Sequence, residues 1–280
     1  MHPSSGRGDR MIIAQISDMH LRDDGILLKQ KIDTEVALEN AIGHINSWET
    51  PPNAILVTGD LVQRTKRQNY ANLRKKLDQL RSPYYVIPGN HDNRTLIREH
   101  FSDLGYLPES GTFLQYSVDT GPLRLIGLDT MIPGENKGEI CGKRCEWLQN
   151  ILHEKPDQPT LIFMHHPPFK TGVNFLDRHQ FQGSELLANI IEQNPQVIRI
   201  VCGHLHRQLQ VSWAGTIASV SPSIAFQLPM ALETDADRGF SLEPPACPVY
   251  IWQPDIGLIA HMSLIGDFGG LQPFVSDPIV

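Results

Sequence analysis

The residues of this chain that could carry out chemistry are concentrated in five short stretches, each directly after an apolar run. The stretches are Asp18-Met19-His20, Gly59-Asp60, Gly89-Asn90-His91-Asp92, His165-His166-Pro167-Pro168 and Gly203-His204-Leu205-His206. Aspartate, asparagine and histidine offer the oxygen and nitrogen atoms that bind divalent metal ions. Their clustering predicts a metal centre whose ligands come from separate parts of the chain.

The spacing within these stretches favours metal binding. Asp18 and His20 are two residues apart, as are His204 and His206. Side chains with this separation point the same way on an extended chain. Glycine before several candidates allows tight turns and close backbone approach. Two imidazoles from one short segment suit a metal site better than a hydrophobic core.

Seven side chains are candidate ligands, which is too many for one ion. They are Asp18, His20, Asp60, Asn90, His165, His204 and His206. Because Asp60 has two carboxylate oxygens, it can bridge two ions about 3.5–4 Å apart, each with about four protein ligands. Two divalent ions and two aspartates leave a net charge of about +2, which suits a phosphate and a bridging hydroxide formed from a water that the metals acidify.

The elements that must position these residues follow from the apolar pattern. We predict strands over residues 11–17, 54–58, 84–87, 112–118, 124–128, 160–164, 197–201, 208–213, 216–220, 249–253 and 258–264. We predict helices over residues 34–48, 67–80, 143–153 and 184–193. This order indicates an α/β fold with one mixed sheet or two stacked sheets and helices outside. Sites in such folds lie at the carboxyl ends of strands, where the five stretches fall.

The composition is typical of one globular domain. The chain has 280 residues, of which 40% are hydrophobic and 20% charged, enough to bury a large core. We predict a loose tail over residues 1–10, a single catalytic domain over 11–270 and a second tail over 271–280. The proline-containing segment 221–248 is predicted to be a cap or a subunit contact.

Charge and cysteine usage narrow the partners and the compartment. The net charge of −7 argues against a broad nucleic-acid-binding surface. All apolar runs are far shorter than the ~18 residues of a membrane-spanning helix, so we expect no membrane partner. Cys141 and Cys145 have no second pair at zinc-site spacing. We therefore predict reduced thiols in a cytoplasmic protein.

The ordered motifs D-x-H, G-D, G-N-H-D, H and G-H-x-H resemble those of the calcineurin-like metallophosphoesterase superfamily. The resemblance covers residues 11–265. The residues that flank the motifs are similar to those of one branch of the superfamily, the class III cyclic-nucleotide phosphodiesterases and bacterial glycerophosphodiesterases. It is carried by residues 16–20, 87–92, 164–168 and 202–206. The resemblance implies two stacked mixed β-sheets flanked by helices, an α/β/β/α sandwich.

The resemblance also implies how the ligands divide between two ions. One ion would take Asp18, His20, Asp60 and His206, and the other Asp60, Asn90, His165 and His204. It selects His165 rather than His166 as the ligand. Asn90 and His91 would contact the phosphate, and His91 would protonate or stabilise the leaving oxygen. We interpret Asp92 either as orienting His91 or as capping the next helix. The donor types fit Mn²⁺, Fe²⁺, Co²⁺ or Zn²⁺.

We therefore expect a dinuclear-metal hydrolase that cleaves small phosphodiesters with a metal-bridging hydroxide. The substrates implied are glycerophosphodiesters or 3′,5′-cyclic nucleotides, and relatives in this branch imply a homo-oligomer. Residues 59–65, Gly-Asp-Leu-Val-Gln-Arg-Thr, lack the second Asp and the Gly of the related protein phosphatases, which argues against that activity. Three alternatives remain: a non-catalytic binding protein on the same fold, an enzyme acting mainly on monoesters or nucleic-acid ends, and a metal store or sensor.

Overall fold

The computed structural model describes residues 10–22, 25–178, 180–233, 239–270 and 272. Apart from Arg10 and Gln272, the predicted tails at 1–10 and 271–280 lie outside the described residues, as do residues 234–238 of the segment 221–248. The described strands are β1 (Met11–Ile16), β2 (Ala54–Val57), β3 (Tyr84–Val86), β4 (Tyr116–Asp119), β5 (Arg124–Leu128), β6 (Thr160–Met164), β7 (Val197–Cys202), β8 (Leu209–Trp213), β9 (Thr216–Val220), β10 (Ala246–Gln253) and β11 (Gly257–Leu264). The described helices are α1 (Thr34–Asn46), α2 (Arg67–Leu77), α3 (Arg94–Phe101), α4 (Gly142–Glu154) and α5 (Ser184–Glu192), with short 3-10 helices at Ser102–Leu104 and Leu176–Arg178.

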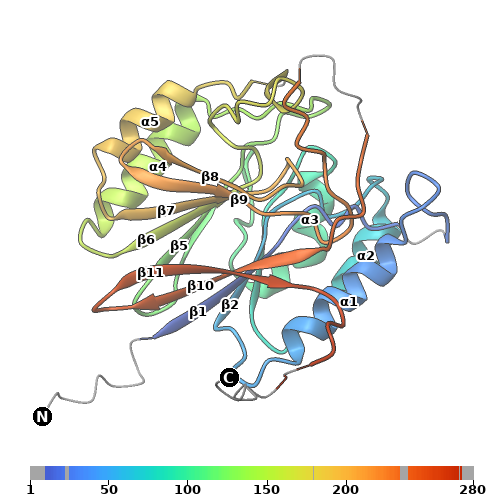
Figure 1. Ribbon diagram of the computed structural model, residues 1–280. Helices are drawn as coiled ribbons and strands as arrows, with labels where there is room; N and C mark the ends of the chain where they lie inside the picture. The colour runs from blue at the N-terminus through green and yellow to red at the C-terminus, as the bar shows by residue number, and fades with distance from the viewer. Residues whose placement is uncertain (1–9, 23–24, 179, 234–238, 271, 273–280) are drawn as a thin grey trace, which may run out of the picture.

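The strands form two mixed sheets. The first has the order β11-β10-β1-β2-β3, in which β1, β2 and β3 are parallel and the β10–β11 hairpin is antiparallel to β1. The second has the order β4-β5-β6-β7-β9-β8, in which β4 and β8 are antiparallel edge strands. Figure 1 shows the sheets stacked, with α4 and α5 outside the second sheet and α1 and α2 outside the first. The predicted fold class is confirmed.

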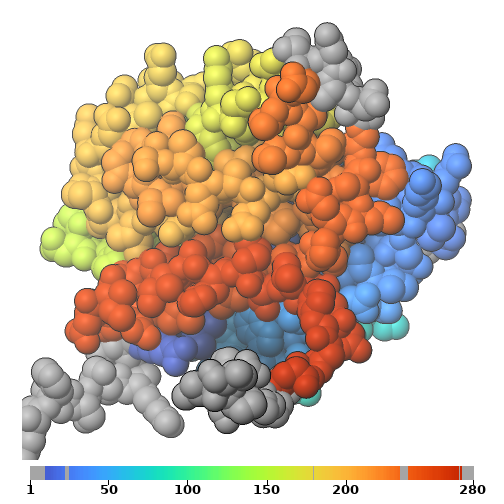
Figure 2. Space-filling view, in the orientation of Figure 1, coloured from blue at the N-terminus to red at the C-terminus, as the bar shows by residue number. Residues whose placement is uncertain are grey.

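Side-chain alternation along the second sheet builds the layers. In β6, Leu161 and Phe163 face the core between the sheets, whereas Ile162 and Met164 face the core beneath α4 and α5. Strands with apolar residues on both faces are typical of parallel sheets covered on both sides. Figure 2 shows how, on one face, the red residues of β10 and β11 lie directly against the orange residues of β8 and β9. Among the described helices, none is both long and apolar enough to cross a bilayer.

The predicted element boundaries agree with the structure to within three residues, with two exceptions. The strand predicted over 112–118 begins only at Tyr116, because the backbone N–H of Leu114 donates to the Asp129 carboxylate at 2.9 Å instead of to a neighbouring strand. Helix α3 follows Asp92, where a helix was expected but no residue range was predicted; Asn93 caps it, and Ile97 and Phe101 form its buried stripe. In addition, β10 begins inside the segment 221–248, at Ala246.

Gln15 links the two sheets just before the predicted site. It lies in β1 and is fully buried. Its Nε2 donates to Oγ1 of Thr58 and to the backbone oxygen of Cys202, each at 2.9 Å, and its Oε1 accepts from the Tyr250 hydroxyl at 2.9 Å. Thr58 directly follows β2, and Cys202 ends β7 of the other sheet. The network therefore fixes the strand ends of one sheet relative to those of the other.

Replacing Gln15 with leucine should lower the free energy of unfolding by about 2–4 kcal/mol, because three buried polar partners lose a hydrogen bond. Urea unfolding would measure the loss. The matched control is Gln79→Leu, an exposed position where the change should stay within about 0.5 kcal/mol. Wild-type stability of Gln15→Leu would show that the network does not hold the sheets together.

Candidate metal centre

The five ligand-bearing stretches meet at one edge of the two-sheet stack. Those with Asp18 and His20, Asp60, and Asn90 and His91 follow the parallel strands β1, β2 and β3 of the first sheet. Those with His165, and with His204 and His206, follow the parallel strands β6 and β7 of the second sheet. Because parallel strands present their carboxyl ends at the same edge, residues far apart in sequence become neighbours.

The backbone at these positions is strained. Of the eight described non-glycine residues with positive φ, five are candidate ligands. They are Asp18 (φ 54°), His20 (φ 43°), Asp60 (φ 49°), His204 (φ 72°) and His206 (φ 46°). Such conformations cost about 1–3 kcal/mol each and concentrate at functional sites. The strain turns these side chains inward from the ends of their strands.

The first group of donor atoms surrounds Nε2 of His20. This nitrogen lies 3.1 Å from Nε2 of His206 and 3.5 Å from Oδ2 of Asp60. Nε2 of His206 lies 3.4 Å from Oδ1 of Asp18. All four side chains are buried, so their donor atoms face one another at the floor of the site.

The second group surrounds Oδ1 of Asn90. This oxygen lies 3.1 Å from Nε2 of His165 and 2.9 Å from Nδ1 of His204. Nε2 of His165 lies 3.4 Å from Oδ1 of Asp60. Asp60 therefore presents one carboxylate oxygen to each group. The structure brings all seven candidate ligands together; that they bind metal, and that they divide between two ions as the resemblance implies, stay predictions.

The protonation states of the site residues suit them as ligands of cations. Burial lowers the pKa of His20 and of His204 to about 3, so both imidazoles are neutral. Burial alone would raise the pKa of Asp18, but His206, His165 and His20 hold it below its ordinary value. Neutral imidazoles, charged carboxylates and an amide oxygen are together the donor set that divalent first-row metals take. The residues present therefore fit such ions.

Two carbonyl groups fix which histidine nitrogens face the centre. Nδ1 of His165 lies 2.8 Å from the backbone oxygen of Thr58, and Nδ1 of His206 lies 3.0 Å from that of Phe226. Because a carbonyl only accepts, each Nδ1 must carry the hydrogen. Nε2 is left with its lone pair directed at the other donors. This is the usual support of a metal-binding histidine.

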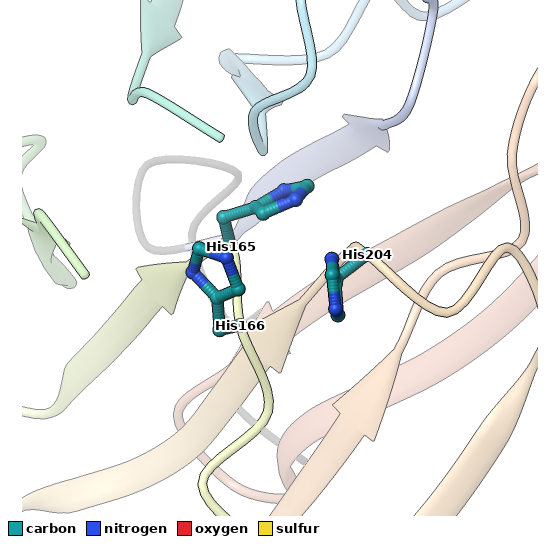
Figure 3. A group of neighbouring side chains, drawn as sticks. All are labelled: His165, His166 and His204. Carbon is teal, nitrogen blue, oxygen red and sulfur yellow. The ribbon is translucent and has the colours of Figure 1, made fainter. Parts of the chain in front are cut away.

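His166 is held in the opposite tautomer. Oγ1 of Thr130 accepts from the backbone N–H of His166 and lies 2.9 Å from its Nδ1. Among the described residues, Nδ1 is the one acceptor given for the Thr130 hydroxyl, so we assign the hydrogen to Nε2. That buried Nε2 has no partner among the described residues. One nitrogen each of His165, His166 and His204 lie within 4.8 Å of one another, yet the rings of His165 and His166 point in different directions (Figure 3). This tautomer makes His166 a hydrogen-bond donor; that His165 and not His166 binds metal stays a prediction.

Two glycines are needed for close packing around the carboxylates. A Cβ at Gly89 would collide with the backbone nitrogen and Oδ1 of Asp60. A Cβ at Gly203 would collide with the Ser17 hydroxyl and with Oδ2 of Asp18. The two site aspartates thus pack directly on glycine backbone.

His91 and Asp92 have separate roles. The backbone N–H of His91 donates to Oδ1 of Asp60 at 2.8 Å, while its half-buried ring lies edge-on to His20 with ring centroids 4.8 Å apart.

Neither role predicted for Asp92 is found. Asn93, and not Asp92, caps α3. The Asp92 carboxylate instead accepts from the backbone N–H of Leu61 and of Gly89 and from the Tyr70 hydroxyl. It fixes the loops that carry Asp60 and Asn90.

Sequence reasoning missed the residues that support the centre. Thr130, which fixes His166, has no motif around it. Phe226 lies in the segment 221–248, which was predicted to be a cap or a subunit contact. It packs instead against the centre, with its ring centroid 4.3 Å from that of His206. Neither role has a local sequence signal, because each depends on which distant strands become neighbours.

A cavity of about 620 Å³ opens above the donor atoms. Its lining includes six predicted site residues, namely His20, Asp60, Asn90, His91, His204 and His206. Its outer part is lined by the cations Lys29 and Arg178 and by Phe175 and Phe240, among others. An anionic substrate with an apolar portion would fit this lining.

Comparison with known proteins agrees with this geometry. Residues 11–208 match the family described as calcineurin-like phosphoesterase. A "probable glycerophosphodiester phosphodiesterase GpdQ" of Arcobacter nitrofigilis is 35% identical over 95% of this chain and 98% of its own length. A "3′,5′-cyclic adenosine monophosphate phosphodiesterase CpdA" of Escherichia coli is 27% identical over 78% of each chain. A dimetal phosphatase from Danio rerio shares the fold with a TM-score of 0.64 at 13% identity, covering 91% of this chain and 99% of that one.

The fold and the site therefore define a phosphoesterase built on two stacked mixed β-sheets. The chain belongs to the calcineurin-like phosphoesterase family, whose members use divalent metal ions. The clustered aspartates and histidines provide the donors for such ions.

Replacing Gly89 with alanine should reduce bound metal to less than half of the wild-type content, because the new Cβ displaces the Asp60 carboxylate that both donor groups share. Elemental analysis after dialysis against Mn²⁺ would measure it. The matched control is Gly43→Ala, in α1, where a Cβ meets no atom within 4 Å. A Gly89→Ala protein with wild-type metal content would contradict the packing argument.

Proposed function

We propose that this protein is a dinuclear-metal hydrolase that cleaves small phosphodiesters, with glycerophosphodiesters or 3′,5′-cyclic nucleotides as substrates. The observation that carries the proposal is the buried carboxylate of Asp60, with Oδ2 3.5 Å from His20 and Oδ1 3.4 Å from His165. A carboxylate between two sets of donors is the arrangement that bridges two ions. The names of the relatives support diesters, since they include glycerophosphodiester and cyclic-nucleotide phosphodiesterases.

Two divalent ions would be held, with Mn²⁺, Fe²⁺, Co²⁺ and Zn²⁺ all compatible with the donors. Asp18, His20, Asp60 and His206 would hold the first, and Asp60, Asn90, His165 and His204 the second. When bound, such ions polarise the phosphoryl group and acidify water near neutral pH. Because the amide of Asn90 is a weak neutral donor, we expect the second ion to bind less tightly. A metal titration would show two separate steps.

The protein's own groups bind the substrate and manage the proton. Lys29 and Arg178 line the cavity and attract the phosphate. Asn90 and His91 contact it beside the donor atoms. Gln63 Nε2 lies 3.5 Å from Nδ1 of His91, close enough to orient the ring. The imidazole would then give a proton to the leaving alkoxide, which departs poorly without one.

A non-catalytic binding protein on this fold is the main alternative. It is less favoured because the seven candidate ligands and His91 are all present and directed at one another. Hydrolysis of monoesters or of nucleic-acid ends is a further alternative. The net charge of −7 argues against nucleic acid as the substrate.

We further propose a single catalytic domain over residues 11–270 that acts in the cytoplasm as a homo-oligomer. Four free cysteines support a reducing compartment. The exposed side chains of Met230, Leu232 and Leu242, in the segment 221–248, support a subunit contact there.

Metal-stripped protein, with and without added Mn²⁺, should be assayed on glycerophosphocholine, 3′,5′-cyclic AMP and an aryl phosphomonoester. We expect metal-dependent turnover of a diester and slower turnover of the monoester. Asp60→Asn should reduce turnover by at least about 10²-fold. The loss of a metal ligand should lower activity more than the loss of a residue that only hydrogen-bonds to a ligand. Asp255→Asn, in the exposed turn between β10 and β11, is the control.

Full activity of Asp60→Asn, or turnover without metal, would contradict the proposal. Two bound ions with no turnover of any of these substrates would favour the binding-protein alternative.

Replacing His91 with alanine should slow hydrolysis of glycerophosphocholine by about 10²–10⁴-fold, because its alkoxide leaving group needs a proton. Diesters of 4-nitrophenol should be affected much less, since nitrophenolate leaves unprotonated. Bound metal should stay at the wild-type content. His153→Ala, an exposed position on α4, is the control. Equal losses on both substrate types would exclude His91 as the proton donor.

A further inference from the structure

A second cavity adjoins the one that holds the donor atoms. It has a volume of about 780 Å³, larger than the first. The two cavities share Leu176, His204 and Leu205 in their linings. Because His204 belongs to the second donor group, the boundary between the cavities runs along the metal centre itself.

The lining of the second cavity indicates binding and not chemistry. Of the candidate ligands, it includes His204 alone. Its walls carry the rings of Phe169, Phe181 and Trp213, and Leu186, which is 53% exposed, beside charged side chains. The charged residues of the lining are Lys170, Asp177 and Glu185. Flat aromatic and apolar surfaces of this kind stack on rings of ligands. A ring-bearing group is therefore the occupant that this lining favours.

Trp213 is held in place by a tight hairpin. It is the last residue of β8 and pairs with Thr216 at the start of β9. The two residues between them, Ala214 and Gly215, have φ of 50° and 78°, as the short turns that match strand twist require. Its ring therefore forms a fixed wall of the cavity and not part of a flexible loop.

The end of the cavity beside the metal centre is polar. His166 and His204 both line it. Thr130 makes Nε2 of His166 a donor, and this buried nitrogen has no partner among the described residues. A buried donor without a partner destabilises the fold unless a ligand pairs with it. A ligand with an oxygen near the phosphorus and a ring farther out would complement both parts of the lining.

The arrangement distinguishes two kinds of phosphodiester. In an acyclic diester the two alcohols leave phosphorus in different directions, so each can enter its own cavity. In a 3′,5′-cyclic nucleotide both ester oxygens belong to one ring system, so the substituent lies on one side. Two cavities that meet at a metal-centre residue fit the acyclic kind.

Resting on the proposed function, we propose that the second cavity receives the ring-bearing alcohol of an acyclic phosphodiester, in which the ring is a nucleobase or an aryl group. Phosphorus lies over the donor atoms in the first cavity. The other alcohol lies in the outer part of the first cavity, near Lys29 and Arg178. Trp213 is the specificity-determining residue.

The test compares four diesters on Mn²⁺-loaded protein: adenosine 5′-(methyl phosphate), methyl 4-nitrophenyl phosphate, glycerophosphoethanolamine and 3′,5′-cyclic AMP. Trp213→Ala should lower kcat/KM about tenfold for the first two, mainly through KM, as expected for losing one stacked ring. It should leave the last two within twofold. Trp213→Phe should restore most of the loss. Val211→Trp, which fills the cavity from β8, should reproduce the pattern of Trp213→Ala without removing the ring.

The control is Trp252→Ala, in β10, which lines neither cavity and should change none of the four rates by more than twofold. Comparing the adenosine diester with the 4-nitrophenyl diester shows whether the cavity favours a nucleobase or an aryl ring. Equal effects of Trp213→Ala and Val211→Trp on all four diesters, or no effect, would overturn the assignment.

Binding of non-hydrolysable analogues keeps this test separate from the proposed function. Calorimetry should show that the methylphosphinate analogue of adenosine 5′-(methyl phosphate), in which carbon replaces both ester oxygens, binds the loaded protein more tightly than dimethylphosphinate, and that Trp213→Ala abolishes the difference. A protein with this difference but no diester turnover would refute the proposed function and support the cavity assignment. A protein with turnover but no such difference would do the reverse.

Discussion

The arrangement of this protein depends on keeping two buried carboxylates charged at one edge of the fold. Asp18 is fully buried and Asp60 is 2% exposed, and a buried carboxylate is very costly without a cation or strong hydrogen bonds. Asp60 meets this requirement from two sides, with one oxygen toward His20 and the other toward His165. The backbone N–H of His91 donates to it as well. Positive charge between these groups is what the surrounding structure is built to accept.

The demand for close approach explains the unusual backbone of the site. Side chains from two sheets must converge on one small volume, so five candidate ligands adopt left-handed conformations, and glycine is needed where a loop packs on a carboxylate. Strain of this kind persists only where its surroundings are rigid. The Gln15 network and the carboxylate of Asp92 supply that rigidity by tying strand ends and loops together.

The supporting residues and the binding residues lie in different parts of the fold. The donor groups follow regular strands, and a structure at 13% identity shares the fold that positions them. The cavities are lined mostly by loops, with helix α5 and the edge strand β8 contributing to the second cavity. Loops tolerate change far better than packed strands. A common centre can therefore serve different diesters, with the choice among them made by residues such as Trp213 outside the donor set.

Much of this was predictable from local signals in the sequence. Strands buried on both faces are continuous apolar runs, and a polar side chain directly after such a run lies at a strand end, so the five stretches and the α/β class could be predicted.

Other features had no local signal. His165 and His166 are equivalent by position, and the choice between their tautomers is made by a Thr58 carbonyl after β2 and a Thr130 hydroxyl after β5. The contact of Phe226 with His206 and the meeting of two cavities at His204 likewise depend on segments far apart in the chain. Sequence alone determined which groups could bind a metal; only the tertiary structure decided their partners, because hydrogen bonds and packing between distant segments exist only once the sheets are stacked.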